Sequence, residues 1–207
     1  MTDTPENPKM KYLKAGLTLS GVTFACLCLI FSVSSITEDV IAAGKINARN
    51  ARFARLFNPE SFDNDPAADC HLLPGPGNTF MRVMTVRKGT ETVGYIVNYS
   101  VIGGYSSPFT MVAGVSADGT ITYTDIEQFN ETPGLGDKVL RSSGGFLDSF
   151  TGASLENRNF NVKKDGGDFD YYTGATVTPR AVARSTGSML EKLRKADPGS
   201  FPVCDSE

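Results

Sequence analysis

Residues Phe109–Phe129 read FTMVAGVSADGTITYTDIEQF, a pattern typical of a β-hairpin. Two runs rich in β-branched and aromatic residues, Phe109–Val115 and Thr120–Phe129, are joined by Ser116–Gly119. Asp118-Gly119 is a strong signal for a tight turn between antiparallel strands. The segment therefore predicts two paired strands.

A second pair of apolar runs lies upstream of this hairpin. Phe80–Val86 and Val93–Ser100 flank the turn-like segment Arg87–Thr92. Two hairpins in succession favour an antiparallel sheet, because antiparallel strands need only short connections. Short helical patches are expected downstream, at Gly136–Leu140 and Gly145–Phe150.

A longer helix is predicted to begin after Thr178. Thr178 is suited to cap it, and Pro179 suits its first position. Apolar residues recur near one face at Val182, Leu190 and Leu193, and Asp197-Pro198-Gly199 ends the helix. Strands that precede the helices, rather than alternate with them, predict an α+β domain: an antiparallel sheet with flanking helices.

The N-terminal region contains a candidate transmembrane helix. Ala15–Ser35 carries no charged residue, and its length matches the roughly 20 residues that cross a bilayer as a helix. We place the span at residues 15–36, after a cytoplasmic tail of residues 1–14. A cleaved signal peptide is the alternative, although its apolar region is usually only about 7–15 residues long.

The segment between the span and the sheet predicts a connector. Thr37–Phe57 lacks Pro and has the spacing of apolar residues expected for a helix that Asn58-Pro59 stops. Asp63–Asn78 is rich in Pro, Gly and Asp and predicts a loop. We assign residues 37–79 to this connector and loop, and residues 80–207 to the folded domain.

Composition excludes several classes of function. The 207 residues carry a net charge of -3 and no long Lys/Arg block, which argues against nucleic-acid binding. The single histidine, His71, offers no ligand set for a metal ion, so no metal is expected. A hydrolase is also disfavoured, since the chain has no G-x-S-x-G elbow.

The four cysteines fall into two pairs. Cys26 and Cys28 lie in the apolar segment, where a thiol behaves as a small hydrophobe. Cys70 and Cys204 remain for the folded domain. They form a disulfide in an oxidising compartment or stay as two unrelated thiols, and the sequence leaves both readings open.

Two short motifs indicate flavin chemistry. Asp170–Thr176, DYYTGAT, resembles the D-x-x-[ST]-G-A-T signature at which a flavin transferase joins FMN through its phosphate to the last threonine. Residues 131–136, ETPGLG, resemble a second motif of the same FMN-binding family. With the run from Lys163 to Arg184, the chain is similar to the G subunits of the Rnf electron-transport complex, and more weakly to the C subunit of the sodium-pumping NADH:quinone oxidoreductase.

The resemblance implies a set of cofactor-binding residues. Thr176 is the expected site of covalent FMN. It is an anchor rather than a catalytic residue, and no catalytic residue is assigned. The expected contacts are Thr173, Gly174, Ala175, Val177, Asp170, Glu131, Thr132, Leu135, Gly136, Tyr105 and Lys164. Tyr105 has the alternative role of a buried core tyrosine, Lys164 that of a solvated lysine, and Pro133-Gly134 that of a simple turn.

The resemblance also implies a place in the cell. The family's members are redox-carrier subunits of a membrane complex that moves electrons between ferredoxin and NAD and couples this transfer to ion transport. The expected arrangement is a single pass through the inner membrane, with the FMN domain on the extracytoplasmic side, other membrane subunits as partners and a flavin transferase for maturation. The alternative is a membrane-tethered binding or sensory module without a covalent cofactor.

Overall fold

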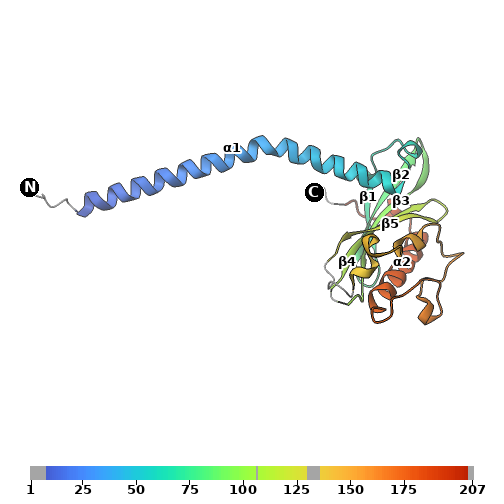
Figure 1. Cartoon of the computed structure of the whole chain (residues 1–207). Helices are drawn as coiled ribbons and strands as arrows, with labels where there is room; N and C mark the ends of the chain where they lie inside the picture. The colour runs from blue at the N-terminus through green and yellow to red at the C-terminus, as the bar shows by residue number, and fades with distance from the viewer. Residues whose placement is uncertain (1–7, 106, 130–135, 205–207) are drawn as a thin grey trace, which may run out of the picture. The chain divides into compact units, whose positions relative to one another are not determined.

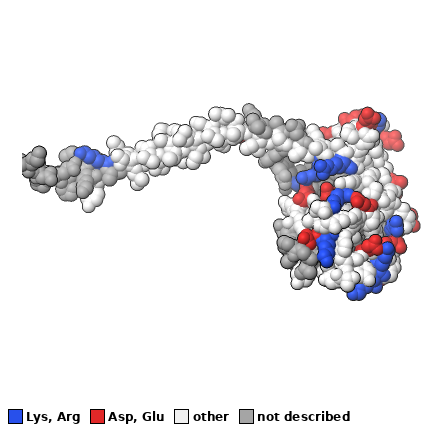
Figure 2. Space-filling view, in the orientation of Figure 1, with Lys and Arg blue, Asp and Glu red and all other residues white. Residues whose placement is uncertain are grey.

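The computed structural model describes residues 8–105, 107–129 and 136–204. The chain forms two compact units, Met1–Ala51 and Arg52–Glu207. The first contains most of helix α1 (Pro8–Leu56), of which Tyr12–Glu38 is long and apolar enough to cross a membrane. Figure 2 shows this stretch almost without charged groups, and its described apolar side chains are exposed. The predicted N-terminal apolar helix is confirmed.

The second unit is built on a five-stranded antiparallel sheet whose strands follow chain order (Figure 1). Both predicted hairpins are present, with strands slightly longer than expected for β2 and β3. The strands are β1 (Cys70–Pro74), β2 (Phe80–Lys88), β3 (Glu91–Val101), β4 (Phe109–Ser116) and β5 (Ile121–Gln128). The predicted α+β class with an antiparallel sheet is confirmed.

One face of the sheet packs against helix α2 (Val177–Lys195) and forms the main core. The predicted apolar face is buried at Val182, Leu190 and Leu193. The buried hydroxyl of Tyr99 on β3 lies 2.8 Å from Thr186 Oγ1 on α2, which satisfies two polar groups inside this core. Burial raises the pKa of Tyr99 far above its ordinary value, so its hydroxyl stays protonated.

The opposite face packs against the end of α1. Phe53, Leu56 and Phe57 are buried there in a second, smaller core. Two glycines permit this close approach: a Cβ on Gly94 would lie 2.8 Å from the Phe57 ring, and one on Gly114 would lie 2.9 Å from the Leu56 carbonyl oxygen. The helix predicted over Thr37–Phe57 is therefore present, and its last turn belongs to the domain.

The loop expected over Asp63–Asn78 is only partly irregular, which corrects that prediction. Strand β1 lies inside it and pairs with β2 from Cys70↔Met84 to Pro74↔Phe80. On its other side, Leu72 N–H donates to the Pro202 carbonyl (2.8 Å) and Cys204 N–H donates to the Cys70 carbonyl (2.9 Å). These partners are distant in sequence, so the local sequence pattern did not predict the strand.

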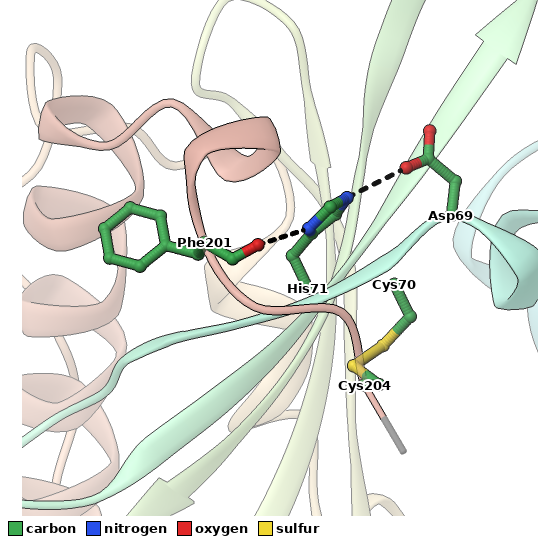
Figure 3. The surroundings of a disulfide bond; sticks show 5 residues. All are labelled: Asp69, Cys70, His71, Phe201 and Cys204. Atoms are coloured by element: carbon green, nitrogen blue, oxygen red, sulfur yellow. Dashed lines mark hydrogen bonds and ion pairs between the residues drawn. A yellow bond between two sulfur atoms is a disulfide. The ribbon is translucent and has the colours of Figure 1, made fainter. Parts of the chain in front are cut away.

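A disulfide joins Cys70 to Cys204, with their Cα atoms 5.4 Å apart. Figure 3 shows His71 beside it, its ring between Asp69 and the backbone of Phe201. His71 Nδ1 lies 2.9 Å from the Phe201 carbonyl oxygen, and Nε2 lies 3.3 Å from Asp69 Oδ1. Of the two readings left open by the sequence, the structure shows the disulfide.

The remaining helical segments are short 3-10 turns. Two of them, Asp137–Val139 and Leu147–Phe150, lie within the predicted helical patches. The second leads to a cluster of aromatic rings in which Phe150 stacks on Phe169 at 4.2 Å. The turns are Pro59–Ser61, Pro66–Ala68, Asp137–Val139, Arg141–Ser143, Leu147–Phe150, Lys163–Asp165 and Pro198–Ser200.

Candidate functional site

Thr176 occupies the N-cap position of α2, which corrects the predicted helix start. The helix begins at Val177, and Thr178, the expected cap, is buried within the first turn. Gly174 has φ +80°, so the chain turns two residues before Thr176 and Thr176 already has helical angles (φ -77°, ψ -23°). The glycine in the motif therefore sets the position of the threonine against the helix.

The hydroxyl of Thr176 makes one hydrogen bond, to the backbone of its own turn. Thr176 is partly exposed, and its Oγ1 donates a long hydrogen bond of 3.3 Å to the Tyr172 carbonyl. The same carbonyl accepts from Ala175 N–H at 2.9 Å, and this bond closes the turn. A Cβ on Gly174 would meet nothing within 4 Å, so the turn faces open space.

The inner side of the turn is packed. Ala175 is buried, and the Tyr172 ring lies 6.3 Å from the ring of Phe146. A Cβ on Gly144 would lie 3.2 Å from the Tyr172 hydroxyl, so the segment before Phe146 runs close beside the turn. Thr173, Gly174 and Asp170 are exposed on the outer side. The motif therefore presents its polar residues outward from a fixed base.

The direction of α2 relates this turn to the sheet. Going back along the helix, Thr186 contacts Tyr99, and Ser185 Oγ accepts from Ile102 N–H at 3.2 Å, just beyond β3. Thr176 lies nine residues earlier, about 13 Å further along the axis. The N-terminal end of α2 thus points toward the end of the sheet that carries the β3–β4 connection and Tyr105.

The other predicted site residues differ in their exposure, and some lie outside the described residues. Tyr105 is 58% exposed, so the alternative of a buried core tyrosine is wrong. Gly136 is buried at the start of the turns that lead to Phe146. Lys164 and Val177 are exposed, Val177 next to Thr176 and Lys164 in the turn Lys163–Asp165. Three further predicted contacts lie outside the described residues: Glu131, Thr132 and Leu135.

An ion-pair cluster that the sequence did not point to flanks the motif on both sides. Asp165 accepts hydrogen bonds from Nε and Nη2 of Arg180, the latter at 2.9 Å, and from Nη2 of Arg184 at 3.2 Å. Hydrogen bonds from Arg180, aided by the charges of Arg180 and Arg184, hold the pKa of Asp165 below its ordinary value. The spacing of Arg180 and Arg184, one turn apart on α2, was the available signal.

The chemistry at Thr176 is limited by what surrounds its hydroxyl. The only hydrogen-bond partner described for Oγ1 is a backbone carbonyl, which is no base. His71 is engaged with Phe201 and Asp69. Two hollows of about 220 and 320 Å³ lie elsewhere, one beside the β4–β5 turn and one over Arg82 and Asn98, and Thr176 lines neither. The described residues around Thr176 therefore supply no base to its hydroxyl.

Comparison with known proteins gives the family. The model of the FMN-binding domain matches residues 104–191. A relative from Salmonella typhi, named as the G subunit of an ion-translocating oxidoreductase complex, is 33% identical over 177 residues, which cover 83% of this chain and 86% of the relative. The chain belongs to this family of G subunits. The resemblance drawn from the motifs is confirmed.

Other G subunits match over even more of the chain. The protein from Yersinia pestis is 30% identical over 93% of this chain and 96% of its own length. The protein from Escherichia coli K12 is 29% identical over 92% and 96%. In the present member of the family, the matched FMN-binding domain begins beside Tyr105 and ends inside α2, so it includes both short motifs.

Proposed function

We propose that the chain is the electron-carrying subunit of a membrane-bound, ion-translocating oxidoreductase of the ferredoxin/NAD type, and that it carries FMN bound covalently to Thr176. The observation that carries the proposal is the position of the partly exposed Thr176, at the N-cap of α2 and at the end of a complete DYYTGAT motif. The names of the relatives and the FMN-binding domain support the redox role.

Attachment requires help from outside the chain. A threonine hydroxyl is a poor nucleophile without a base, and none is described beside Oγ1. A flavin transferase that brings its own base and a flavin dinucleotide donor would complete the step. The bond from Thr176 Oγ to the flavin phosphate forms, the phosphoanhydride of the donor breaks, a nucleoside monophosphate leaves, and the hydroxyl proton passes to the base.

The start of α2 suits the product. A phosphodiester keeps one negative charge, which is stabilised at the positive end of a helix dipole. The first N–H groups of a helix have no partner within the helix, and no described side chain caps this end. The N–H groups of Val177 and Thr178 would hold the phosphate, while Pro179 has none to offer.

The bound flavin would supply reversible one- and two-electron transfer. A phosphate linkage leaves its ring chemically untouched, so the surrounding residues tune its potential. We assign this contact role to Glu131, Thr132, Leu135 and Gly136 of the ETPGLG segment, and to Tyr105. Tyr105 is exposed and lies at the end of the sheet toward which the N-terminal end of α2 points. Both facts support its assignment as a flavin contact.

The direct test is flavin fluorescence after denaturation. Protein from a host that has the transferase is separated on a denaturing gel under ultraviolet light. A fluorescent band at the mass of the chain is expected, because a covalent bond survives unfolding. A dark band from a host whose transferase is shown to be active would favour the rival function, a membrane-tethered sensory module without covalent cofactor.

We place the domain on the extracytoplasmic side of the inner membrane, with residues 1–14 inside. The Cys70–Cys204 disulfide supports this, since disulfides persist in oxidising compartments and are rare in the cytosol. Protease added to intact spheroplasts should therefore cleave the domain without lysis. Protection until lysis would reverse the topology.

Asp170→Asn should reduce covalent flavin at least about tenfold while the chain still folds. Asp170 is the acidic residue of the motif, and its only described ion pair, to Lys163 at 2.6 Å, joins two exposed side chains and adds little stability. Gel fluorescence per mole of chain measures the effect. Lys163→Ala removes the same ion pair and keeps the acid, so it is the matched control. Full modification of a folded Asp170→Asn protein would remove Asp170 from the site.

A further inference from the structure

The residues on either side of the DYYTGAT motif are fixed independently. Before the motif, Phe169 is buried against Phe150, its N–H donates to the Asn161 carbonyl at 3.1 Å, and its carbonyl accepts from Lys163 N–H at 2.7 Å. After the motif, α2 is anchored on the sheet. The stretch from Asp170 to Thr173 crosses between these two supports, and all of it except the half-buried Tyr172 is exposed.

Asp165 joins the two supports. Its carboxylate lies in the turn before the motif, yet both of its cationic partners, Arg180 and Arg184, stand on the first two turns of α2. Its side chain is 22% exposed and that of Arg180 is 30% exposed, so this ion pair is better shielded than the Lys163–Asp170 pair, at 58% and 73%. Paired bonds between a guanidinium and a carboxylate also fix direction, not only distance.

The cluster extends further into the loop. Arg184 Nε donates to Asn161 Oδ1 at 3.0 Å. The Asn161 backbone is covered by Gly167, where a Cβ would lie only 2.0 Å from the Asn161 carbonyl oxygen. The loop is thus bonded to α2 through the side chains of Asp165 and Asn161. At Gly167 it has no room for a larger residue.

We propose that Asp165 is a positioning residue for the modification of Thr176: by holding Arg180 and Arg184, it keeps the motif in the one conformation that a flavin transferase binds. The proposal rests on the proposed function. Without the carboxylate, the bond from Arg184 to Asn161 is what remains of this cluster between loop and helix, so the loop moves more freely and only a fraction of the chains presents the motif correctly. The apparent affinity of the transferase for the chain is reduced in proportion to that fraction, while the chemical step at Thr176 is unchanged.

Kinetics of labelling separate this role from a general loss of structure. Full-length chain, produced without the transferase and purified in detergent, is incubated with transferase and a flavin dinucleotide, and initial rates are read from gel fluorescence. Asp165→Asn is expected to raise the KM for the chain about three- to fivefold, with kcat unchanged. Asp165→Glu, which keeps the charge, should have a KM for the chain close to that of the wild type.

The chain provides a matched control. Glu156 pairs with Arg194 at 2.9 Å and ties another loop to the opposite end of α2, far from the motif. Glu156→Gln should leave KM and kcat at their wild-type values. Should Asp165→Asn fail to fold, Arg180→Lys serves in its place, because it keeps the charge and removes the paired geometry.

The outcomes distinguish the two levels of the proposal. If the wild-type chain is not labelled, the proposed function fails and this inference falls with it. If the wild type is labelled and the folded Asp165→Asn protein has an unchanged KM, only the positioning role is wrong. A loss of the same size in Glu156→Gln would likewise show that any ion pair on α2 has this effect and would overturn the assignment to Asp165.

Discussion

Thr176→Ala is expected to abolish covalent flavin and to stop electron transfer through the assembled complex. The substitution removes the oxygen to which the phosphate would be joined. No other redox group is expected to replace the flavin: the described residues hold no cluster of metal ligands, and the one disulfide ties β1 to the C-terminal segment. Gel fluorescence and the turnover of membranes containing the complex measure the two effects.

The fold should tolerate this change. The hydroxyl of Thr176 makes one long bond of 3.3 Å and caps no backbone group, so its loss should cost less than about 1 kcal/mol. Thr173→Ala is the matched control, since it alters the same exposed turn and leaves the attachment oxygen, and it should reduce modification less. A Thr176→Ala complex that assembles without flavin and still turns over at the wild-type rate would contradict the relay role.

Removal of the Cys70–Cys204 disulfide should cause the largest loss of stability in the domain. The bond closes a separation of 134 residues, and in the chain-entropy model such a bond stabilises the fold by about 5 kcal/mol. Domains are commonly stable by only about 5–15 kcal/mol, so Cys70→Ser/Cys204→Ser should lie near the limit of folding. Urea unfolding in detergent should show a midpoint lower by about 2 M.

The other two cysteines give the control. Cys26 and Cys28 are free thiols on α1, and Cys26→Ser/Cys28→Ser should leave the midpoint of the domain unchanged. Reductant should lower the midpoint of the wild type to that of Cys70→Ser/Cys204→Ser and have no effect on Cys70→Ser/Cys204→Ser itself. Equal midpoints for reduced and oxidised wild type would show that the hydrogen bonds to β1 alone hold the C-terminal segment.

The elements that the sequence predicted well are those with local signals. The β4–β5 hairpin follows from Asp118-Gly119 between two runs rich in β-branched and aromatic residues. The buried face of α2 follows from the spacing of Val182 and Leu190. The position of the motif just before a helix was also readable. Only the cap was misplaced: it is Thr176 and not Thr178. The chain turns at Gly174, which has a left-handed φ, and the sequence alone does not give this backbone angle.

The missed features depend on partners that are distant in the chain. Strand β1 forms because Cys70–Pro74 meets β2 and the C-terminal segment, contacts that its own five residues do not encode. Asp165 contacts Arg180, which is fifteen residues later in the chain. The sequence does not show that the turn of Asp165 lies against α2, so the role proposed for Asp165 could not be inferred from it. The disulfide stayed open for the same reason, since a sequence does not give the distance between two Cα atoms.

The pairing at the two outer strands has a consequence for assembly. An unpaired sheet edge is a template for strand addition by another chain. At β1 the outer backbone groups are bonded to residues 202–204, and at β5 those of Ile121 are bonded to Gly152 and Ala153. Neighbouring subunits therefore cannot extend the sheet at these positions without displacing the chain's own segments. At these positions we expect them to contact the domain through its side chains.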